Sequence, residues 1–182
     1  MEKKDLLKDV IKHIDIKSYN STELVDAMRN MSFTSRDTAR AADILMMMCK
    51  EKECTNILTL AGSTSAAGCM QVYVDMVRNK MIDVVVATGA SIIDMDLFEA
   101  LGFKHYIGEK ENVIPDTTLR ELYIDRIYDT YIDEEELQAC DHTTFEIANM
   151  LEARPYSSRE FIYEIGKWLH EGNAVKKDSL IQ

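Results

Sequence analysis

Proline and glycine are scarce in this chain, with 2 Pro and 7 Gly among 182 residues. Their scarcity excludes collagen-like and low-complexity material. Long apolar runs are also missing, because no stretch approaches the roughly 18 apolar residues that span a membrane. Residues 1–5 are mostly charged and lack the apolar region of a signal peptide. We therefore expect a cytoplasmic protein with no membrane partner.

Basic residues are outnumbered: 21 Lys and Arg face 32 Asp and Glu, which gives a formal net charge of −11. Phosphate contacts need a basic face, so this balance argues against nonspecific nucleic-acid binding. We expect no nucleic-acid partner. The hydrophobic fraction of 46% excludes a disordered chain, and the length suits one compact domain with a sizeable core.

Cysteine pairs with the spacing of a metal site are missing as well. The chain has 4 Cys, none in a C-x-x-C pair, and Cys49 and Cys54 have no matching pair at zinc-finger distance. The 4 His are scattered along the chain. We predict free thiols in a reducing compartment and no metal.

Two short apolar runs stand out, at residues 56–61 and 82–87, and each leads into a loop of small residues. Continuous runs with β-branched residues are typical of strands buried on both faces. Residues 66–80 lie between them, and their apolar spacing suits a helix that packs on the sheet. This order predicts a βαβ unit, and hence an α/β fold with a parallel sheet and flanking helices.

Helical patterns occupy much of the remaining chain. Caps and apolar spacing predict helices that begin near Ser21 and near Thr34. The acidic residues 133–136 lack calcium-loop spacing and are interpreted as a solvated helix start. Residues 105–116 are expected to be irregular, and residues 176–182 resemble the opening of a helix. Further helices are predicted through Leu97 to Gly102 and over 117–124, 133–151 and 157–170.

The first small-residue loop, residues 62–68, follows a predicted strand and opens a helix. Its backbone N–H groups and hydroxyls could hold a phosphate at the helix N-terminus. It is neither a G-x-G-x-x-G motif nor a P-loop. The alternative is a tight strand–helix turn that simply needs small residues.

The second loop, residues 87–96, has the same position after the second run. Ligands of open parallel sheets bind at the carboxyl ends of strands, where both loops are expected. Asp94 and Asp96 could anchor ribose hydroxyls or a cationic substrate. Alternatively, Asp94 caps a helix and Asp96 favours its dipole.

Several segments together resemble the bacterial and archaeal branch of the deoxyhypusine synthase family. The resemblance extends over nearly the whole chain from about Thr34, and the segments that carry it are residues 63–68, 81–86, 88–90, 96–102, 124–129 and 155–162. It implies an NAD-binding, Rossmann-like fold. It also implies a division into a helical extension, residues 1–33, and the N-terminal half of the family's α/β domain, residues 34–182.

The resemblance further implies NAD-dependent transfer of an aminobutyl group from spermidine or a related polyamine to a protein lysine or another amine. It implies a homotetramer with sites at subunit interfaces. An acidic pair of the family falls on Ile93 and Asp94, so Asp96 is a candidate for the missing acid after a one-residue shift. The residues implied for NAD are Gly62, Ser63, Thr64, Ser65, Ala66, Thr88, Gly89, Ala90 and Asp94, and those implied for the polyamine are Asp94 and Asp96.

The family's nucleophilic lysine belongs to its second half and is expected beyond Gln182. Lys167 follows a glycine, as in the catalytic segment, but it lies in a predicted amphipathic helix and is rejected. We therefore expect the chain alone to be inactive, as a truncated product, a partial sequence, or a split subunit with a separate C-terminal polypeptide. The alternatives are a noncatalytic NAD-binding partner that completes a sister subunit's site, and an unrelated α/β binding module.

Overall fold

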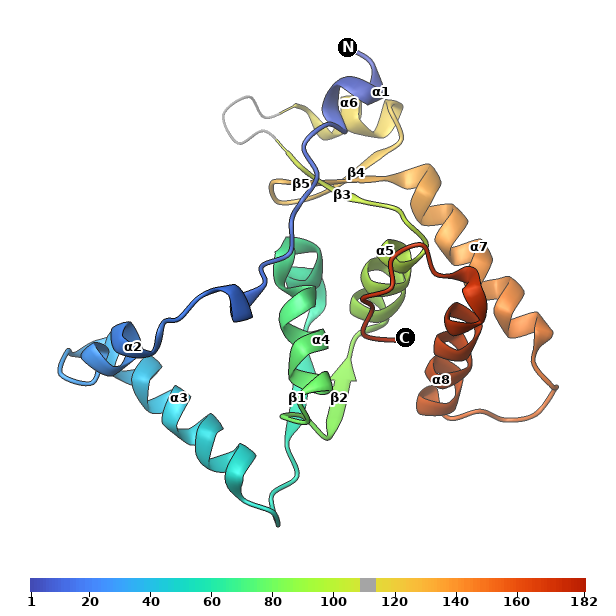
Figure 1. Ribbon diagram of the computed structural model, residues 1–182. Coiled ribbons are helices and arrows are strands. Elements are labelled where there is room, and N and C mark those ends of the chain that lie inside the picture. Colours follow the sequence, from blue (N-terminus) through green and yellow to red (C-terminus); the bar gives the residue numbers. More distant parts are fainter. Residues whose placement is uncertain (109–113) are drawn as a thin grey trace.

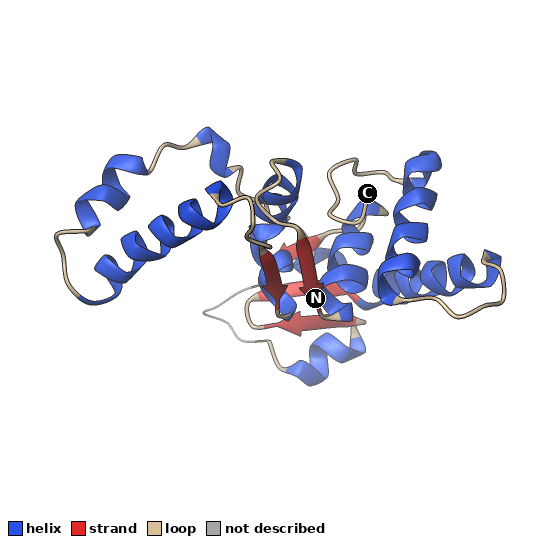
Figure 2. Cartoon of the chain, turned by 90° about the horizontal axis from the view of Figure 1, so that it is seen from below, coloured by secondary structure: helices blue, strands red, loops and turns tan. Residues whose placement is uncertain are grey.

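The computed structural model describes residues 1–108 and 114–182 (Figure 1). Part of the segment predicted as irregular, residues 109–113, therefore lies outside the described residues. Strands occupy the centre of the molecule and helices surround them (Figure 2). No helix in the described part of the chain combines the length and the apolar character needed to cross a membrane.

A parallel pair of strands confirms the predicted βαβ unit. Strand β1 (Ile57–Leu60) pairs with β2 (Val84–Ala87), so that Ile57 faces Val84 and Leu60 faces Ala87. The connection contains a short 3-10 helix, η2 (Gly62–Thr64), a π-helical turn, η3 (Ser65–Cys69), and helix α4 (Met70–Arg78). Helix α4 buries Met70 and Val74, and its packing on the sheet stays a prediction.

The prediction that these strands are buried on both faces is wrong. Ile57, Val84 and Val86 are 56%, 42% and 56% exposed, whereas Leu60 is buried. Exposure alternates along both strands, as it does when one face of a sheet is covered and the other is open. The described residues therefore leave one apolar face of the parallel pair uncovered.

A second sheet was not predicted. Strands β3 (His105–Ile107), β4 (Ile124–Ile127) and β5 (Thr130–Asp133) form an antiparallel sheet in the order β3-β5-β4. Helix α6 (Asp116–Glu121) ends earlier than the predicted helix over 117–124, because Tyr123 takes a positive φ of 55° and turns the chain into β4. A single parallel sheet is thus an incomplete description of the fold.

The N-terminal segment contains α1 (Lys3–Leu6), the 3-10 turn η1 (Ile16–Ser18), α2 (Thr22–Met28) and α3 (Phe33–Lys50). The predicted starts of the two longer helices near Ser21 and Thr34 are confirmed to within one residue. Helices α2 and α3 pack on each other and extend away from α7 and α8 (Figure 1). The division of the chain at residue 33 stays a prediction.

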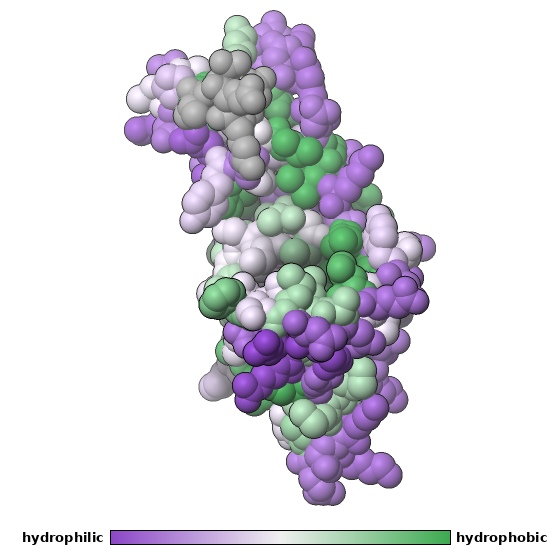
Figure 3. Space-filling model, turned by 90° about the vertical axis from the view of Figure 1, so that its left-hand side faces the viewer, coloured by the Kyte–Doolittle hydropathy of each residue, from purple (hydrophilic) through white to green (hydrophobic). Residues whose placement is uncertain are grey.

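Apolar side chains remain exposed on this hairpin. Figure 3 views the molecule from its side and shows apolar patches among hydrophilic residues. Leu24, Phe33 and Met47 are 61%, 89% and 61% exposed. An exposed apolar surface of this kind is typical of a contact face rather than of a free surface.

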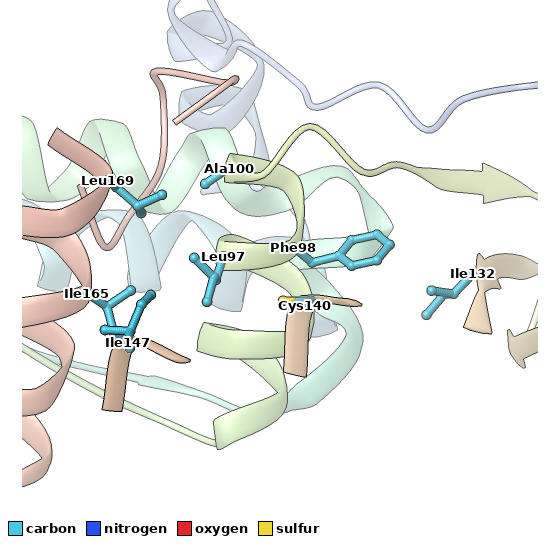
Figure 4. Packing of buried hydrophobic residues seen from close by; sticks show 8 residues of the cluster. All are labelled: Leu97, Phe98, Ala100, Ile132, Cys140, Ile147, Ile165 and Leu169. Atoms are coloured by element: carbon cyan, nitrogen blue, oxygen red, sulfur yellow. The ribbon is translucent and has the colours of Figure 1, made fainter. Parts of the chain in front are cut away.

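The main core lies where the π-helical segment η4 (Ala90–Leu97) and α5 (Phe98–Ala100) meet α7 (Glu134–Met150), α8 (Ser158–Trp168) and the π-helical turn η5 (Leu169–Asn173). Figure 4 shows how these elements and strand β5 bring together the buried cluster of Leu97, Phe98, Ala100, Ile132, Cys140, Ile147, Ile165 and Leu169. The cluster spans about 70 residues of sequence, so tertiary packing rather than local propensity holds these helices in place.

The predicted starts of α7 and α8 are confirmed by their caps. Asp133 accepts hydrogen bonds from the N–H groups of Glu135 and Glu136, and acids fill the first turn of α7. Ser157 and Glu160 form a capping box at α8. The acidic cluster is therefore a helix start, as interpreted.

The C-terminal segment does not open a helix, contrary to the prediction for residues 176–182. It runs back over the core, where the N–H of Val175 donates to the carbonyl of Ala100 at 2.8 Å. Gly166 allows the close approach, because a Cβ there would lie 2.5 Å from the carbonyl oxygen of Ile181. Hydrogen bonds to the Ala100 carbonyl and to the Asp96 carboxylate replace those that a further helix would make.

Candidate functional site

The two small-residue loops lie next to each other at the carboxyl ends of β1 and β2. The N–H of Thr88 donates to the carbonyl of Leu60 at 3.3 Å. The hydroxyl of Ser91 donates to the carbonyl of Gly62 at 3.5 Å. Parallel pairing of the strands forces this arrangement, because both chains leave the sheet at the same edge.

The first loop has an outer and an inner part. Gly62 and Ser63 are half-buried and Thr64 is exposed, so these residues form its outer surface. Ser65 and Ala66 are 1% and 2% exposed. The Ser65 hydroxyl donates to the sulfur of Met95 in η4 at 2.8 Å. Ser65 and Ala66 therefore support the loop from beneath.

Tyr73 and Ser91 complete these loops and were missed from the sequence. The Tyr73 hydroxyl, from the fourth residue of α4, donates to the Thr64 hydroxyl at 2.8 Å. Ser91 is buried and lies 3.4 Å from the Thr88 hydroxyl of its own loop, and its hydrogen bond to the Gly62 carbonyl ties that loop to the first. The sequence did contain a signal for Ser91. Thr88 and Ser91 are three positions apart, and hydroxyl residues at this spacing are typical of helix starts.

The backbone at two loop glycines faces open space. A Cβ built on Gly62 or Gly89 meets no atom within 4 Å. Gly68 of the same segment is different, because its φ is +96° and a Cβ would lie 3.0 Å from the carbonyl oxygen of Lys12. The fold explains Gly68, but neither strain nor crowding in this chain explains Gly62 and Gly89. Room in front of a glycine backbone is what close approach of a ligand requires.

Asp94 does not cap a helix, so that interpretation is wrong. The segment η4 begins at Ala90, with Gly89 as its N-cap, and places Asp94 within it. The side chain is half-buried, and burial together with repulsion from Asp141 of α7 raises the pKa of Asp94. Among residues 1–108 and 114–182 neither carboxylate forms an ion pair, so the two acids together favour a cation here. Asp141 was not predicted, since only packing of α7 on η4 brings it near.

Asp96 is held by the chain itself. It is 2% exposed and lies at the end of η4, so its interpretation as a charge at a helix start is also wrong. Its carboxylate accepts from the Ser179 hydroxyl at 3.0 Å and from the N–H groups of Leu180 and Ile181 at 2.8 Å each. Burial raises the pKa of Asp96, and these three hydrogen bonds oppose the rise. Any contact with a cationic ligand therefore depends mainly on Asp94.

The structure also places the cysteines, the residue types that ligate metals, and Lys167. All 4 cysteines are free, and burial raises the pKa of the Cys140 thiol to about 12. Within residues 1–108 and 114–182, no three His, Cys, Asp or Glu side chains gather as metal ligands. Lys167 lies on α8, and its ammonium pairs with the Glu164 carboxylate at 3.5 Å.

An open cavity of about 1110 Å³ lies away from the loops, between α6, β4 and α7. Four of its five charged side chains pair with each other. The Arg126 guanidinium lies 2.7 Å from the Asp116 carboxylate. A hydrogen bond with Glu134 raises the pKa of Asp125 to about 6. The loops, whose open backbone is unexplained, are the better candidate for a ligand site.

The fold and these loops define an α/β protein with its candidate site at the carboxyl end of a parallel strand pair. A family model, deoxyhypusine synthase, matches residues 23–182. The chain belongs to the deoxyhypusine synthase family.

Relatives support this membership. A deoxyhypusine synthase-like protein of Caulobacter vibrioides is 66% identical over 181 residues, which cover 100% of this chain and 49% of that protein. Deoxyhypusine synthase-like proteins of Coxiella burnetii and Chlorobaculum tepidum are 58% and 52% identical, with 51% of each covered. The chain therefore spans about half the length of the curated relatives it matches.

A solved structure is similar in fold. A crystal structure named for a deoxyhypusine synthase from Entamoeba histolytica superposes with a TM-score of 0.50 at 21% sequence identity. The match covers 91% of this chain and 59% of that chain. At this identity the likeness concerns the fold.

Proposed function

We propose that this chain supplies the NAD-binding loops and part of the polyamine site of a deoxyhypusine synthase-like transferase. Such an enzyme moves an aminobutyl group from spermidine to a protein lysine or another amine. The observation that carries the proposal is the open backbone at Gly62 and Gly89, on neighbouring loops of a chain that belongs to this family. Assembly as a tetramer and a cytoplasmic location are further proposals from the resemblance.

The outer loop residues suit a dinucleotide. The segments 62–66 and 88–90 contain no acidic residue that would repel a pyrophosphate. Ser63, Thr64 and Thr88 offer hydroxyl donors, and the loop backbone adds N–H donors. Gly62, Gly89 and Ala90 let the backbone approach the ligand closely. When bound, NAD would supply the hydride acceptor, and this chain would hold and orient it.

Asp94 suits one ammonium group of the polyamine. Its carboxylate is half-buried, which strengthens attraction to a cation relative to open water. Asp141 adds a second negative charge from α7. The role of this chain toward the amine is therefore to bind and position it beside the loops.

Replacement of Gly62 or Gly89 by valine is expected to weaken NAD binding by about tenfold or more, because the new side chain fills the space proposed for the ligand. The free energy of unfolding should change by no more than about 1 kcal/mol, since no atom of the chain is displaced. Isothermal titration calorimetry and denaturant unfolding measure the two effects.

Two control variants separate binding from folding. Ala153→Val adds the same kind of bulk at an exposed position and should leave NAD affinity unchanged. Gly68→Ala should lose about 1–3 kcal/mol of stability through its positive φ and the Lys12 carbonyl. Unaltered NAD affinity in both valine variants would reject the cofactor site.

Replacement of Asp94 by asparagine is expected to weaken spermidine binding about tenfold in a complex that binds the polyamine. The variant should be no less stable than the parent, because it removes the repulsion from Asp141. Asp37→Asn makes the same charge change at an exposed site on α3 and serves as control. Equal spermidine affinity for both variants would assign Asp94 no part in amine binding.

A second candidate function is a noncatalytic partner subunit that binds NAD or completes a sister subunit's site. The uncovered apolar face of Ile57, Val84 and Val86 favours contact with another polypeptide under either function. The two functions differ in whether that polypeptide and this chain together form a working enzyme.

A further inference from the structure

Side chains from four segments of the chain meet at the Glu99 carboxylate. Glu99 Oε2 lies 2.6 Å from His13 Nε2 and accepts from Lys176 Nζ at 2.5 Å. Glu99 Oε1 lies 2.9 Å from His105 Nδ1. Burial alone would raise the pKa of Glu99, but hydrogen bonds from these three groups lower it well below its usual value. The carboxylate is therefore ionised, and each partner nitrogen donates to it.

This geometry leaves one nitrogen of each imidazole ring without a partner. His13 Nδ1 and His105 Nε2 are buried and make no hydrogen bond within the described part of the chain. The His105 side chain is fully buried, and its ring packs on Phe98 at 5.0 Å between centroids. Buried polar atoms without a partner are rare in folded proteins, because each loses its hydrogen bonds to water.

A cavity of about 340 Å³ lies beside this cluster. Both histidines, Lys104, Lys176 and Glu99 line it together with apolar residues that include Val10, Ile11 and Phe103. Glu99 is the single acid in this lining, against two lysines. The charged side chains of the lining therefore add up to one net positive charge beside apolar walls, which favours a small organic anion over a cation.

We propose that this cavity binds the oxyanion of a small molecule, a carboxylate or a phosphate group, beside the ammonium groups of Lys104 and Lys176. The apolar walls contact the body of the ligand. The site is separate from the NAD loops, since none of the loop residues lines this cavity. It adds a second ligand to the one proposed for the loops and does not depend on it.

Histidine NMR of the 182-residue chain tests the proposal, with sodium phosphate and sodium acetate as probes and sodium chloride at matched ionic strength as reference. The 4 His include two internal controls, the exposed His142 and His170. We expect phosphate or acetate to shift the signals of His13 and His105 saturably and to leave the other two unchanged. Saturation by phosphate at the lower concentration identifies a phosphate ligand, and the reverse order identifies a carboxylate.

Two lysine variants test which positive charge contributes to anion binding. Lys104 is exposed, lines the cavity and makes no contact with Glu99, so Lys104→Gln should preserve the fold and weaken anion binding about tenfold. Lys177→Gln removes the same charge next to Lys176 but outside the cavity and should change affinity less than about twofold. Equal affinities in the two variants, or shifts that match chloride at all four histidines, overturn the proposal.

Discussion

Glu99→Ala is expected to lower the free energy of unfolding by about 3–5 kcal/mol, the cost typical of removing one partner from a buried ion pair. The variant leaves three basic groups around an empty position, and the side chains of His105 and His13 are only 0% and 13% exposed. It also releases the contact that joins the N-terminal segment, α5 and the C-terminal segment. Urea unfolding followed by fluorescence of Trp168, the single tryptophan, measures the loss.

Glu146→Ala is the matched control, because Glu146 also pairs with a histidine, His142, at 3.3 Å but in an exposed position. We expect a change below about 1 kcal/mol there. A loss in Glu99→Ala no larger than this would show that the cluster adds nothing to folding.

The pH dependence of stability provides a second readout of Glu99. The pKa of this carboxyl is lowered in the folded chain, whereas the unfolded value is about 4.3. Its stabilisation is therefore complete above the unfolded pKa and is lost as the pH falls below it. Glu99→Gln should flatten the decline of stability between about pH 5 and pH 3.

The 182-residue chain by itself is expected to form no aminobutyl adduct when incubated with NAD and spermidine and trapped with borohydride. Trapping requires a desolvated lysine with a free electron pair. Lys167 is 58% exposed and pairs with Glu164, and the Lys176 ammonium donates to Glu99. An ion-paired ammonium is protonated and is a poor nucleophile. Intact mass spectrometry detects the adduct, and its presence on any lysine of this chain would contradict the prediction.

Addition of a polypeptide that corresponds to the second half of the Caulobacter vibrioides relative is expected to restore the adduct, on the added polypeptide. The expected change is from no adduct to a full mass shift of the added polypeptide. An adduct favours the split enzyme. A complex that binds NAD but gives no adduct favours the noncatalytic partner.

Local sequence signals predicted the structure correctly where it depends only on residues that are close together in the sequence. The runs at 56–61 and 82–87 have β-branched residues, a helix between them and small residues after each, so they predict parallel pairing. Serine caps followed by an acidic first turn predict the start of α8, where Ser157 and Glu160 form a capping box in the structure. The candidate loops follow from the same reasoning, because strand direction decides at which edge they emerge.

The antiparallel sheet could not be predicted in this way. Its strands have three or four residues, too few for a clear alternation. The turn between β4 and β5 contains Tyr128 at a φ of 55° instead of an Asn-Gly or similar signal. Burial of β1 and β2 was also overestimated, because what covers a sheet face is decided by other parts of the fold.

The sequence by itself thus determined the parallel βαβ unit, the capped helices and the two loops, since each depends on neighbours within a few residues along the chain. Only the tertiary structure decided the roles of the buried acids. From the sequence, Asp96 was either a charge at a helix start or a ligand contact. In the structure its carboxylate accepts hydrogen bonds from the N–H groups of Leu180 and Ile181. Glu99 showed no local signal, because its partners come from positions 13, 105 and 176. A buried carboxylate needs hydrogen-bond donors in place of water, and the donors to Glu99 come together only in the folded chain.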